Sequence, residues 1–307
     1  MGKTFEEFSE TVISHIKDYL PDSYMDASVN IQEVKKNNGK LLHGLVIKRP
    51  GETLVPVIYL ESFFEAYQKG TKIIEYILLD IVSEYQKVAP DADQYADIKE
   101  RLMDWENVKE HVGMRLINAG WNTERLVELP FILMEDLAIT FYVKLDEKVH
   151  IQVNHYIFNL WDISISDLYE QAAKNTVRSG IVVKTAMQLF REILGDSESE
   201  EIEKGKGLYI LTTKKRSSYG AAAFLCPGVL KNIYQQIGNF TILPSCVHEV
   251  ILAVGDSFDF AELREMVMEV NLNVVDPEER LSNNIYRYDP IKDNVEIIYT
   301  EQEEEYA

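Results

Sequence analysis

The chain has 307 residues, of which 46% are hydrophobic, and its 51 acidic residues outnumber its 31 basic ones to give a formal net charge of -20. This negative charge argues against direct binding to nucleic acid or to anionic membranes. The only two cysteines, Cys226 and Cys246, exclude a disulfide framework, and no segment resembles a signal peptide or approaches the run of about 20 apolar residues that spans a membrane. We therefore expect a cytoplasmic protein.

The N-terminal segment predicts a helix followed by a hairpin. Apolar residues recur at spacings of three and four from Phe5 to Tyr19, and Thr4 with Glu7 forms a capping box at the start of this helix. Between residues 27 and 48 the pattern changes to strand, turn and strand, with Asn38-Gly39 supplying the positive φ angles of a tight hairpin turn.

A third strand and several helices follow this hairpin. Pro56 cannot donate a hydrogen bond within a ladder, so a strand over residues 54–60 is expected at a sheet edge. Ser62 with Glu65 predicts a helix cap, and Thr71 starts the next helix. A further helix ends near residue 105, and residues 112–117 read as a short strand.

The second half of the chain alternates between strands and helices. Ser164 and Asp167 predict the cap of a helix that runs to Gly180, and another helix is expected up to Gly195. Asp276-Pro277 has the residues of a helix start. The remaining expected elements are a helix over 258–271, capped by Asp256 or Ser257, and strands over 137–145, 149–161, 207–213, 221–225, 239–243, 249–254, 285–288 and 295–299.

These elements come in clusters and not in strict strand–helix alternation, which favours an α+β fold over a doubly wound parallel sheet. We expect mixed or antiparallel sheets with helices packed on one face. The length predicts two subdomains, which we place at residues 1–125 and 126–300, followed by an acidic tail over 301–307.

Familiar cofactor motifs are absent from the sequence. Gly205-Lys206-Gly207 lacks the glycine spacing and the ending of a phosphate-binding loop. His248-Glu249 begins like a zinc-protease motif, but Leu252 stands where the second histidine is needed. His150 and His155 are expected on opposite faces of one strand, so they would not share an ion. We therefore expect no metal and no cofactor.

One segment brings a nucleophile type and a base type together. Ser245, Cys246, His248 and Glu249 lie within five residues, and in extended chain Cys246 and His248 would share a face. Against a catalytic role, a free cysteine usually behaves as a small buried hydrophobe, and the partners of a nucleophile normally come from distant segments.

A second segment differs from the rest of the chain in charge. No acidic residue lies between Lys204 and His248. Within this stretch, Lys214, Lys215, Arg216 and Tyr219 fall in a predicted turn that would present cations, hydroxyls and backbone donors to an anion or an acidic partner. The alternative is structural, because buried strands need no acids and a basic turn can pair with an acidic surface.

Several stretches together resemble a family of uncharacterised bacterial proteins. They are Arg115 to Asn118, Asp136 to Ile139, Asp167 to Asn175, Ile242 to Ile251 and Glu279 to Asp289. The resemblance covers nearly the whole chain, from the Asn38-Gly39 hairpin onward. It implies a cytoplasmic protein of anaerobic Gram-positive bacteria, often carried on mobile elements, and it supplies no catalytic residues. A weaker likeness from Asp136 onward points to another bacterial family of unassigned activity.

The chain departs from that family's pattern at one position that matters for function. The family tends to have two serines where this chain has Ser245-Cys246, which argues against a nucleophilic role for Cys246. Three functional hypotheses follow: a non-enzymatic interaction or regulatory module that binds a protein partner or small anion, a hydrolase that uses Ser245 or Cys246 with His248, and an acidic mimic of nucleic acid in defence or counter-defence.

Overall fold

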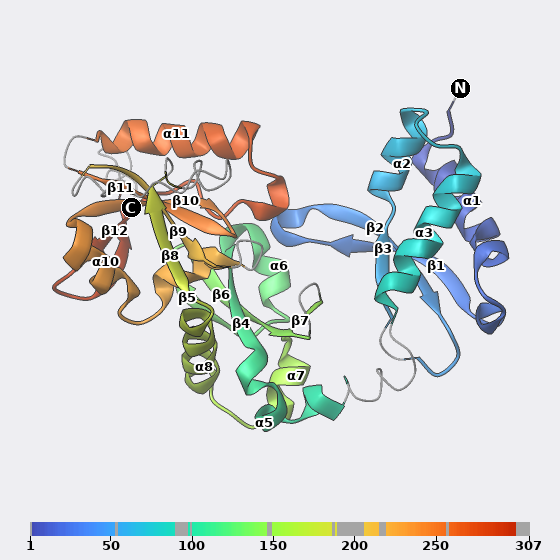
Figure 1. The fold of residues 1–307 in the computed structure, drawn as a ribbon, viewed down its shortest axis with the longest axis horizontal. Coiled ribbons are helices and arrows are strands. Elements are labelled where there is room, and N and C mark those ends of the chain that lie inside the picture. The colour runs from blue at the N-terminus through green and yellow to red at the C-terminus, as the bar shows by residue number, and fades with distance from the viewer. Residues whose placement is uncertain are drawn as a thin grey trace. The chain divides into compact units, whose positions relative to one another are not determined.

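The protein folds into two compact units, residues 1–99 and residues 100–307. The computed structural model describes residues 2–52, 55–89, 98, 100–145, 149–185, 188, 206–214, 219–255 and 258–298. Over these residues it has an α+β fold with three antiparallel sheets, as the sequence predicts (Figure 1).

The first unit is a three-stranded antiparallel sheet in the order β1-β2-β3 with helices packed on it. The Thr4–Glu7 capping box is present at the start of α1, and Phe8 and Val12 on this helix are buried. Asn38 and Gly39 both have positive φ, within a five-residue connection between the first two strands. The elements are α1 (Phe5–His15), η1 (Ile16–Tyr19), η2 (Asp22–Tyr24), β1 (Ser28–Lys35), η3 (Asn37–Gly39), β2 (Leu41–Lys48), β3 (Val57–Tyr59), α2 (Glu61–Gln68) and α3 (Ile74–Val88).

Two predictions for the first unit concern strand and helix ends. The third strand, β3, does lie at the edge of its sheet and begins directly after Pro56. The predicted side-chain caps of α2 and α3 are wrong, because neither helix has a side-chain cap hydrogen bond and their N-cap residues are Leu60 and Ile73.

The second unit contains the other two sheets. A six-stranded antiparallel sheet has the order β13-β12-β10-β11-β9-β8, and in a four-stranded sheet β6 pairs with β4 on one side and with β5 and β7 on the other. The strands are β4 (Val112–Asn118), β5 (Phe131–Met134), β6 (Leu137–Lys144), β7 (His150–Gln152), β8 (Ile181–Thr185), β9 (Gly207–Thr213), β10 (Phe240–Cys246), β11 (Glu249–Val254), β12 (Tyr286–Asp289) and β13 (Asn294–Ile297).

Helices and short turns cover these two sheets. In Figure 1, α8 lies beside β4 and α11 lies along the six-stranded sheet, where Leu263 and Val267 pack with Leu243 of β10. The capping box of Ser164 and Asp167 is present in α8. The helical elements are α5 (Trp105–Val108), η4 (Lys109–His111), η5 (Gly120–Asn122), α6 (Thr123–Leu126), α7 (His155–Leu160), α8 (Ile165–Arg178), η6 (Gly220–Leu225), α10 (Val229–Ile237), α11 (Phe260–Asn273) and η7 (Pro277–Glu279).

The boundary between the units lies upstream of the 125/126 position expected from the sequence, because β4 pairs along its whole length with β6. Residues 100–125 therefore fold with the second unit. The acidic tail over 301–307 lies outside the described residues.

Several element predictions for the second unit are wrong. Residues 149–161 form β7 and then α7, because the Asn154 side chain accepts a hydrogen bond from the Ile157 N–H and caps a helix there. Residues 220–225 form the short helix η6 instead of a strand, and α11 is capped by Asp259. The helix expected up to Gly195 begins as strand β8, and most of it lies outside the described residues.

Among the residues that the structure describes, no helix is both long and apolar enough to cross a membrane.

Candidate functional site

The four-stranded sheet of the second unit has one apolar face and one face that carries polar side chains. Side chains alternate between faces along a strand, so Met114 and Phe141 point into the main core while Arg115 and Tyr142 lie on the other face. His150 of β7 pairs with Lys144 of β6, next along the strand from Tyr142 on that face. The sheet register therefore gathers Arg115, Tyr142 and His150 on one surface.

Gly113 lets the Tyr142 ring lie flat across this surface. Gly113 pairs directly with Tyr142 in the β4–β6 ladder. A Cβ atom at position 113 would lie 2.4 Å from Tyr142 Cζ, a distance that real contacts do not show. The absence of a side chain at Gly113 therefore fixes where the tyrosine ring sits.

A hairpin turn from the six-stranded sheet brings His248 to the same surface. Val247 and His248 form the turn between β10 and β11, with Cys246 paired to Glu249. The Val247 N–H donates to the Glu279 carbonyl at 2.9 Å, and the Thr212 hydroxyl donates to the His248 carbonyl at 2.8 Å. The turn is thus held from two sides, and the extended chain assumed for residues 246–248 from the sequence is wrong.

Tyr219 enters the same region in an unusual backbone conformation. Its φ of 52° lies in the left-handed region, which is costly for a residue with a side chain. Gly220 follows it, and a Cβ there would come within 2.5 Å of the His248 carbonyl oxygen and 2.4 Å of Thr212 Oγ1. The tight approach of residue 220 to the hairpin turn places the Tyr219 ring beside His248.

The result is a group of stacked rings with a guanidinium over one of them, which we call the Tyr219 cluster: Arg115, Tyr142, His150, Tyr219 and His248. The Tyr219 ring lies 5.9 Å from the His248 ring at 12°, 5.2 Å from Tyr142 and 5.8 Å from His150. Tyr142 and His150 stack at 4.7 Å. The Arg115 guanidinium carbon lies 4.7 Å from the Tyr219 ring centre, in a cation–π contact.

In the Tyr219 cluster, Nε of Arg115 and Nδ1 of His248 are buried and have no hydrogen-bond partner among the described residues. The other ring nitrogen of His248, Nε2, lies 3.3 Å from the Glu279 carboxylate. Burial beside Tyr219 raises the pKa of the Tyr142 hydroxyl to about 12, so this group stays protonated. The cluster therefore holds a buried N–H donor, Arg115 Nε, and a buried ring nitrogen, His248 Nδ1, that have no hydrogen-bond partner among the described residues.

A cavity of about 190 Å³ adjoins the Tyr219 cluster, with Tyr142 forming part of both. Lys144, His111 and Thr213 also line this cavity. Lys214 starts the predicted basic turn, and its backbone N–H donates to the Gly180 carbonyl, next to the cavity residue Ser179. The two described ends of the turn, Lys214 and Tyr219, thus lie close to the walls of the cavity.

The site residues predicted from the sequence do not all lie in one place in the structure. Tyr219 and His248 are at the centre of the Tyr219 cluster, and Lys214 lies beside the small cavity. Lys215 and Arg216 lie outside the described residues. Ser245, Cys246 and Glu249 flank the His248 turn and are half-buried.

No nucleophile–base pair is present among the described residues of this hairpin. Cys246 Sγ accepts a hydrogen bond from the backbone N–H of His248, at 3.4 Å, and not from its ring. No hydrogen bond joins the described His248 ring to Ser245 or Cys246. Burial raises the pKa of the Cys246 thiol above its ordinary value, which works against a reactive thiolate.

A second polar group, the Asp136 network, lies at the start of β6. The Asp136 carboxylate accepts hydrogen bonds from the Ser282 hydroxyl at 2.5 Å, the Tyr286 hydroxyl at 2.6 Å and the amides of Asn284 and Asn118 at 3.0 and 3.3 Å. The same Asn118 amide also donates to the Leu281 carbonyl. Burial and the Asp136 charge hold the pKa of Tyr286 well above its ordinary value. This network fixes the 281–286 segment, which follows Glu279, to the turn of the four-stranded sheet.

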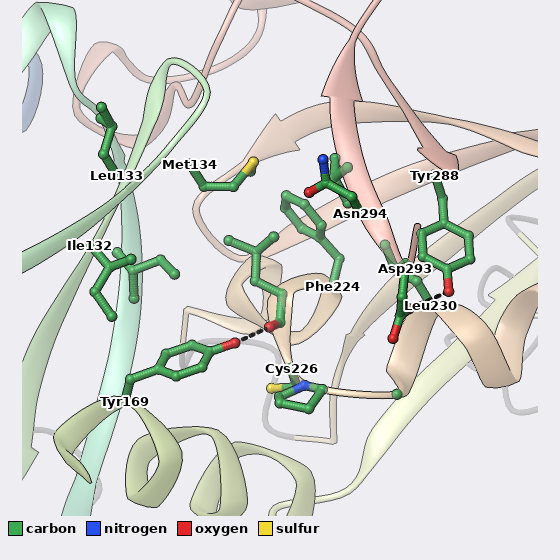
Figure 2. Close-up of a pocket in the computed structure, with 15 residues that line it drawn as sticks. Ile132, Leu133, Met134, Tyr169, Phe224, Cys226, Leu230, Tyr288, Asp293 and Asn294 are labelled. Carbon is green, nitrogen blue, oxygen red and sulfur yellow. Dashed lines mark hydrogen bonds between the residues drawn. The ribbon is translucent and has the colours of Figure 1, made fainter. Parts of the chain in front are cut away.

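A larger cavity of about 420 Å³ lies elsewhere in the second unit (Figure 2). It is bounded by β5, α8, the segment from η6 into α10, and the turn between β12 and β13. Its walls are mostly apolar. No residue singled out as a site candidate from the sequence lines it, because its lining comes from these segments and from Ile139 of β6, all of ordinary core composition.

Among the described residues, no group of three or more histidine, cysteine, aspartate or glutamate side chains is arranged to hold a metal ion.

The profile of a family of unknown function, DUF5688, matches residues 5–290. The chain belongs to this family. In comparisons with curated proteins and with solved structures, nothing matches. Membership in DUF5688 assigns no activity, so any function has to be argued from the geometry above.

Proposed function

We propose that this DUF5688 protein is a non-enzymatic binding or regulatory module that captures an anionic group, a carboxylate or a phosphate, at the Tyr219 cluster. The observation that carries the proposal is Arg115. Its guanidinium is packed on Tyr219, its Nε is buried, and no described acidic group pairs with it. A buried guanidinium N–H without a hydrogen-bond partner is unfavourable, and a bound anion would accept from it.

The charges around the cluster support an anionic ligand over a cationic one. Two acids near the cluster have partners, because Glu279 lies beside His248 and Glu110, which lines the small cavity, pairs with Arg178. Cationic groups on the other side of Tyr142 include Lys144 at the small cavity and Lys214 beside it. In a chain of net charge -20, the grouping of Arg115, Lys144 and Lys214 around these rings is a local feature and not a general property of the surface.

The chemistry of the ring system also suits capture of an anion. A guanidinium presents paired N–H donors that match the two oxygens of a carboxylate or phosphate. The cavity of about 190 Å³ next to Tyr142 is large enough for a small anion or for the end of an acidic side chain. The stacked rings hold Arg115 and His248 in fixed positions, which lowers the ordering cost of binding.

The other two hypotheses receive less support from the geometry. The hydrolase hypothesis needs an activated nucleophile, and neither Ser245 nor Cys246 has a hydrogen bond to the described His248 ring. The nucleic-acid mimic hypothesis is supported only by the net negative charge of the chain, and no other feature of the described residues favours it. The bacterial, cytoplasmic and mobile-element setting implied by the resemblance stays a prediction.

The test is a calorimetric titration at constant ionic strength, in which inorganic phosphate or a short oligoglutamate peptide is added to the protein and the heat of binding is measured. We expect Arg115→Met to weaken binding of the probe that the wild-type protein captures by about tenfold or more, because hydrogen bonds to a charged group contribute roughly 1.5–3 kcal/mol. Arg287→Met is the matched control, since Arg287 is an exposed arginine that pairs with Glu296.

Equal weakening by Arg115→Met and Arg287→Met would mean that only net charge matters, and this would overturn the proposal. Absence of binding of both probes to the wild-type protein would overturn it as well.

A further inference from the structure

The larger cavity of the second unit combines an apolar interior with one acidic group at its mouth. Its volume of about 420 Å³ lies within the range of roughly 300–1,000 Å³ that is typical of small-molecule sites. Figure 2 shows Ile132 and Met134 of β5 on one side, with Phe224 and Leu230 across from them. The cavity is separate from the Tyr219 cluster in its lining residues and in its charge.

The polar groups in the wall are already used within the protein. The Tyr169 hydroxyl donates to the Leu225 carbonyl at 2.6 Å. The buried Cys226 thiol points to the Ala173 carbonyl, with Sγ 3.8 Å from the oxygen, and burial raises its pKa to about 12. The wall therefore offers apolar surface to a ligand body and few free hydrogen-bonding groups.

The mouth of the cavity is different in character. Asp293 is exposed there, and the Tyr288 hydroxyl donates to one of its carboxylate oxygens (Figure 2). Its second oxygen has no partner among the described residues, and neighbouring Lys292 pairs with Asp289 and Glu296 instead. The Asn294 side chain lies beside it. A negative charge without a cation thus faces the entrance of an apolar chamber.

We propose that this cavity binds a small amphiphilic cation, with an aromatic or branched aliphatic body in the chamber and a protonated amine at Asp293. The apolar body gains from leaving water against Ile132, Met134 and Phe224. The amine at the mouth remains partly solvated, so its contribution to affinity is modest and its main effect is on selectivity. The inference does not depend on the anion site.

The experiment uses three probes of nearly equal size and different charge: 2-phenylethylammonium, 2-phenylethanol and 3-phenylpropionate. Binding is followed through the methyl resonance of Met134 in the full chain. We expect the ammonium probe to bind about two- to fivefold more tightly than the alcohol, because an exposed ion pair adds an increment of this size to the affinity. The carboxylate probe should bind most weakly.

Two variants assign the site. Asp293→Asn should remove the preference for the ammonium probe and leave binding of the alcohol unchanged. The matched control is Asp162→Asn, because Asp162 is also an exposed aspartate with positive φ, 49° against 51° for Asp293. Ile132→Trp should fill the chamber and abolish binding of all three probes; if that variant does not fold, the Asp293→Asn comparison still decides the question.

The inference is overturned if no probe shifts the Met134 resonance, if the carboxylate probe binds as tightly as the ammonium probe, or if the preference survives in Asp293→Asn. Each of these outcomes leaves the phosphate titration at the Tyr219 cluster unaffected, so failures of the two proposals are distinguishable.

Discussion

The Asp136 network and the Tyr219 cluster both contain polar and aromatic side chains and both lie against the four-stranded sheet. They differ in whether their polar groups have hydrogen-bond partners within the described protein. Asp136 accepts four hydrogen bonds from residues of two separate segments. In the Tyr219 cluster, the Arg115 guanidinium packs on the Tyr219 ring, and its buried Nε has no described partner.

This difference separates a structural role from a binding role. A half-buried carboxylate whose hydrogen bonds are made within the protein stabilises the fold and specifies which segments meet. Buried donors left without partners cost stability, and a protein tolerates them where a ligand or substrate completes them. The two regions can therefore be told apart by what their variants do to stability and to binding.

The largest expected effect is on the Asp136 network. Asp136→Asn replaces an acceptor of four hydrogen bonds by an amide whose own N–H groups face other donors. We expect the free energy of unfolding to fall by about 3 kcal/mol, because Asp136 is half-buried and its partners Ser282 and Tyr286 are fully buried and would lose their acceptor. Denaturant unfolding measures the loss, with Asp162→Asn as an exposed control. A loss as small as that of the control would mean that the network is not structural.

The next largest effect is on the approach of Gly220 to the His248 turn. In Gly220→Ala the new Cβ would lie 2.5 Å from a backbone oxygen, so one of the two segments has to move. We expect a loss of about 2 kcal/mol in unfolding free energy, as overpacking typically causes. Gly120→Ala is the control, since its Cβ would meet the nearest atom at 3.5 Å. Equal effects of the two variants would contradict the packing described for Tyr219 and His248.

A smaller effect is expected from alkaline pH acting on Tyr142. Its pKa is about 12 in the folded protein, so the unfolded chain releases this proton first and stability falls as pH rises. Between about pH 9 and about pH 11 this one group should lower the unfolding free energy by about 1 kcal/mol. Tyr142→Phe should flatten the pH dependence by that amount, whereas Tyr156→Phe, which changes an exposed tyrosine, should not. The same slope in both variants would argue against burial of the Tyr142 hydroxyl.

The smallest effect concerns thiol reactivity near neutral pH. Burial raises the pKa of both thiols, to about 12 for Cys226, so few thiolates are present. We expect iodoacetamide to label the folded protein more slowly than a free cysteine by about tenfold or more, with Cys246 labelled before the more deeply buried Cys226. Fast labelling of Cys246 that is lost in His248→Ala would revive the hydrolase hypothesis.

The sequence predicted much of the fold where the signal is local. The Thr4–Glu7 and Ser164–Asp167 caps are present because each needs only residues three apart. Strand β5 was missed because it is a short strand whose assignment depends on pairing with β6. The end of α8 near Gly180 was predicted, but strand β8 was missed because the residues after it were assigned to a second helix and their strand conformation depends on pairing with β9.

The candidate site was predicted only in part for the same reason. Tyr219 stood out because it falls in the basic turn of an acid-free stretch, and His248 because it lies close to Ser245 and Cys246. Arg115, Tyr142 and His150 could not be added from the sequence, since they meet Tyr219 through the register of a different sheet. The alternation of polar and apolar residues along β4 and β6 was a usable signal for the face on which they lie. It did not indicate what would cover that face.

The measurement that tests the contrast most directly is the phosphate-dependent shift of the unfolding midpoint in three proteins: wild type, Asp136→Asn and Arg115→Met. The account predicts that Asp136→Asn lowers the midpoint but keeps the upward shift on adding phosphate. It predicts that Arg115→Met starts close to the wild-type midpoint and loses the shift, because only ligand bound to the folded state raises stability. An Arg115→Met protein that is as destabilised as Asp136→Asn and still shifts fully with phosphate would contradict it.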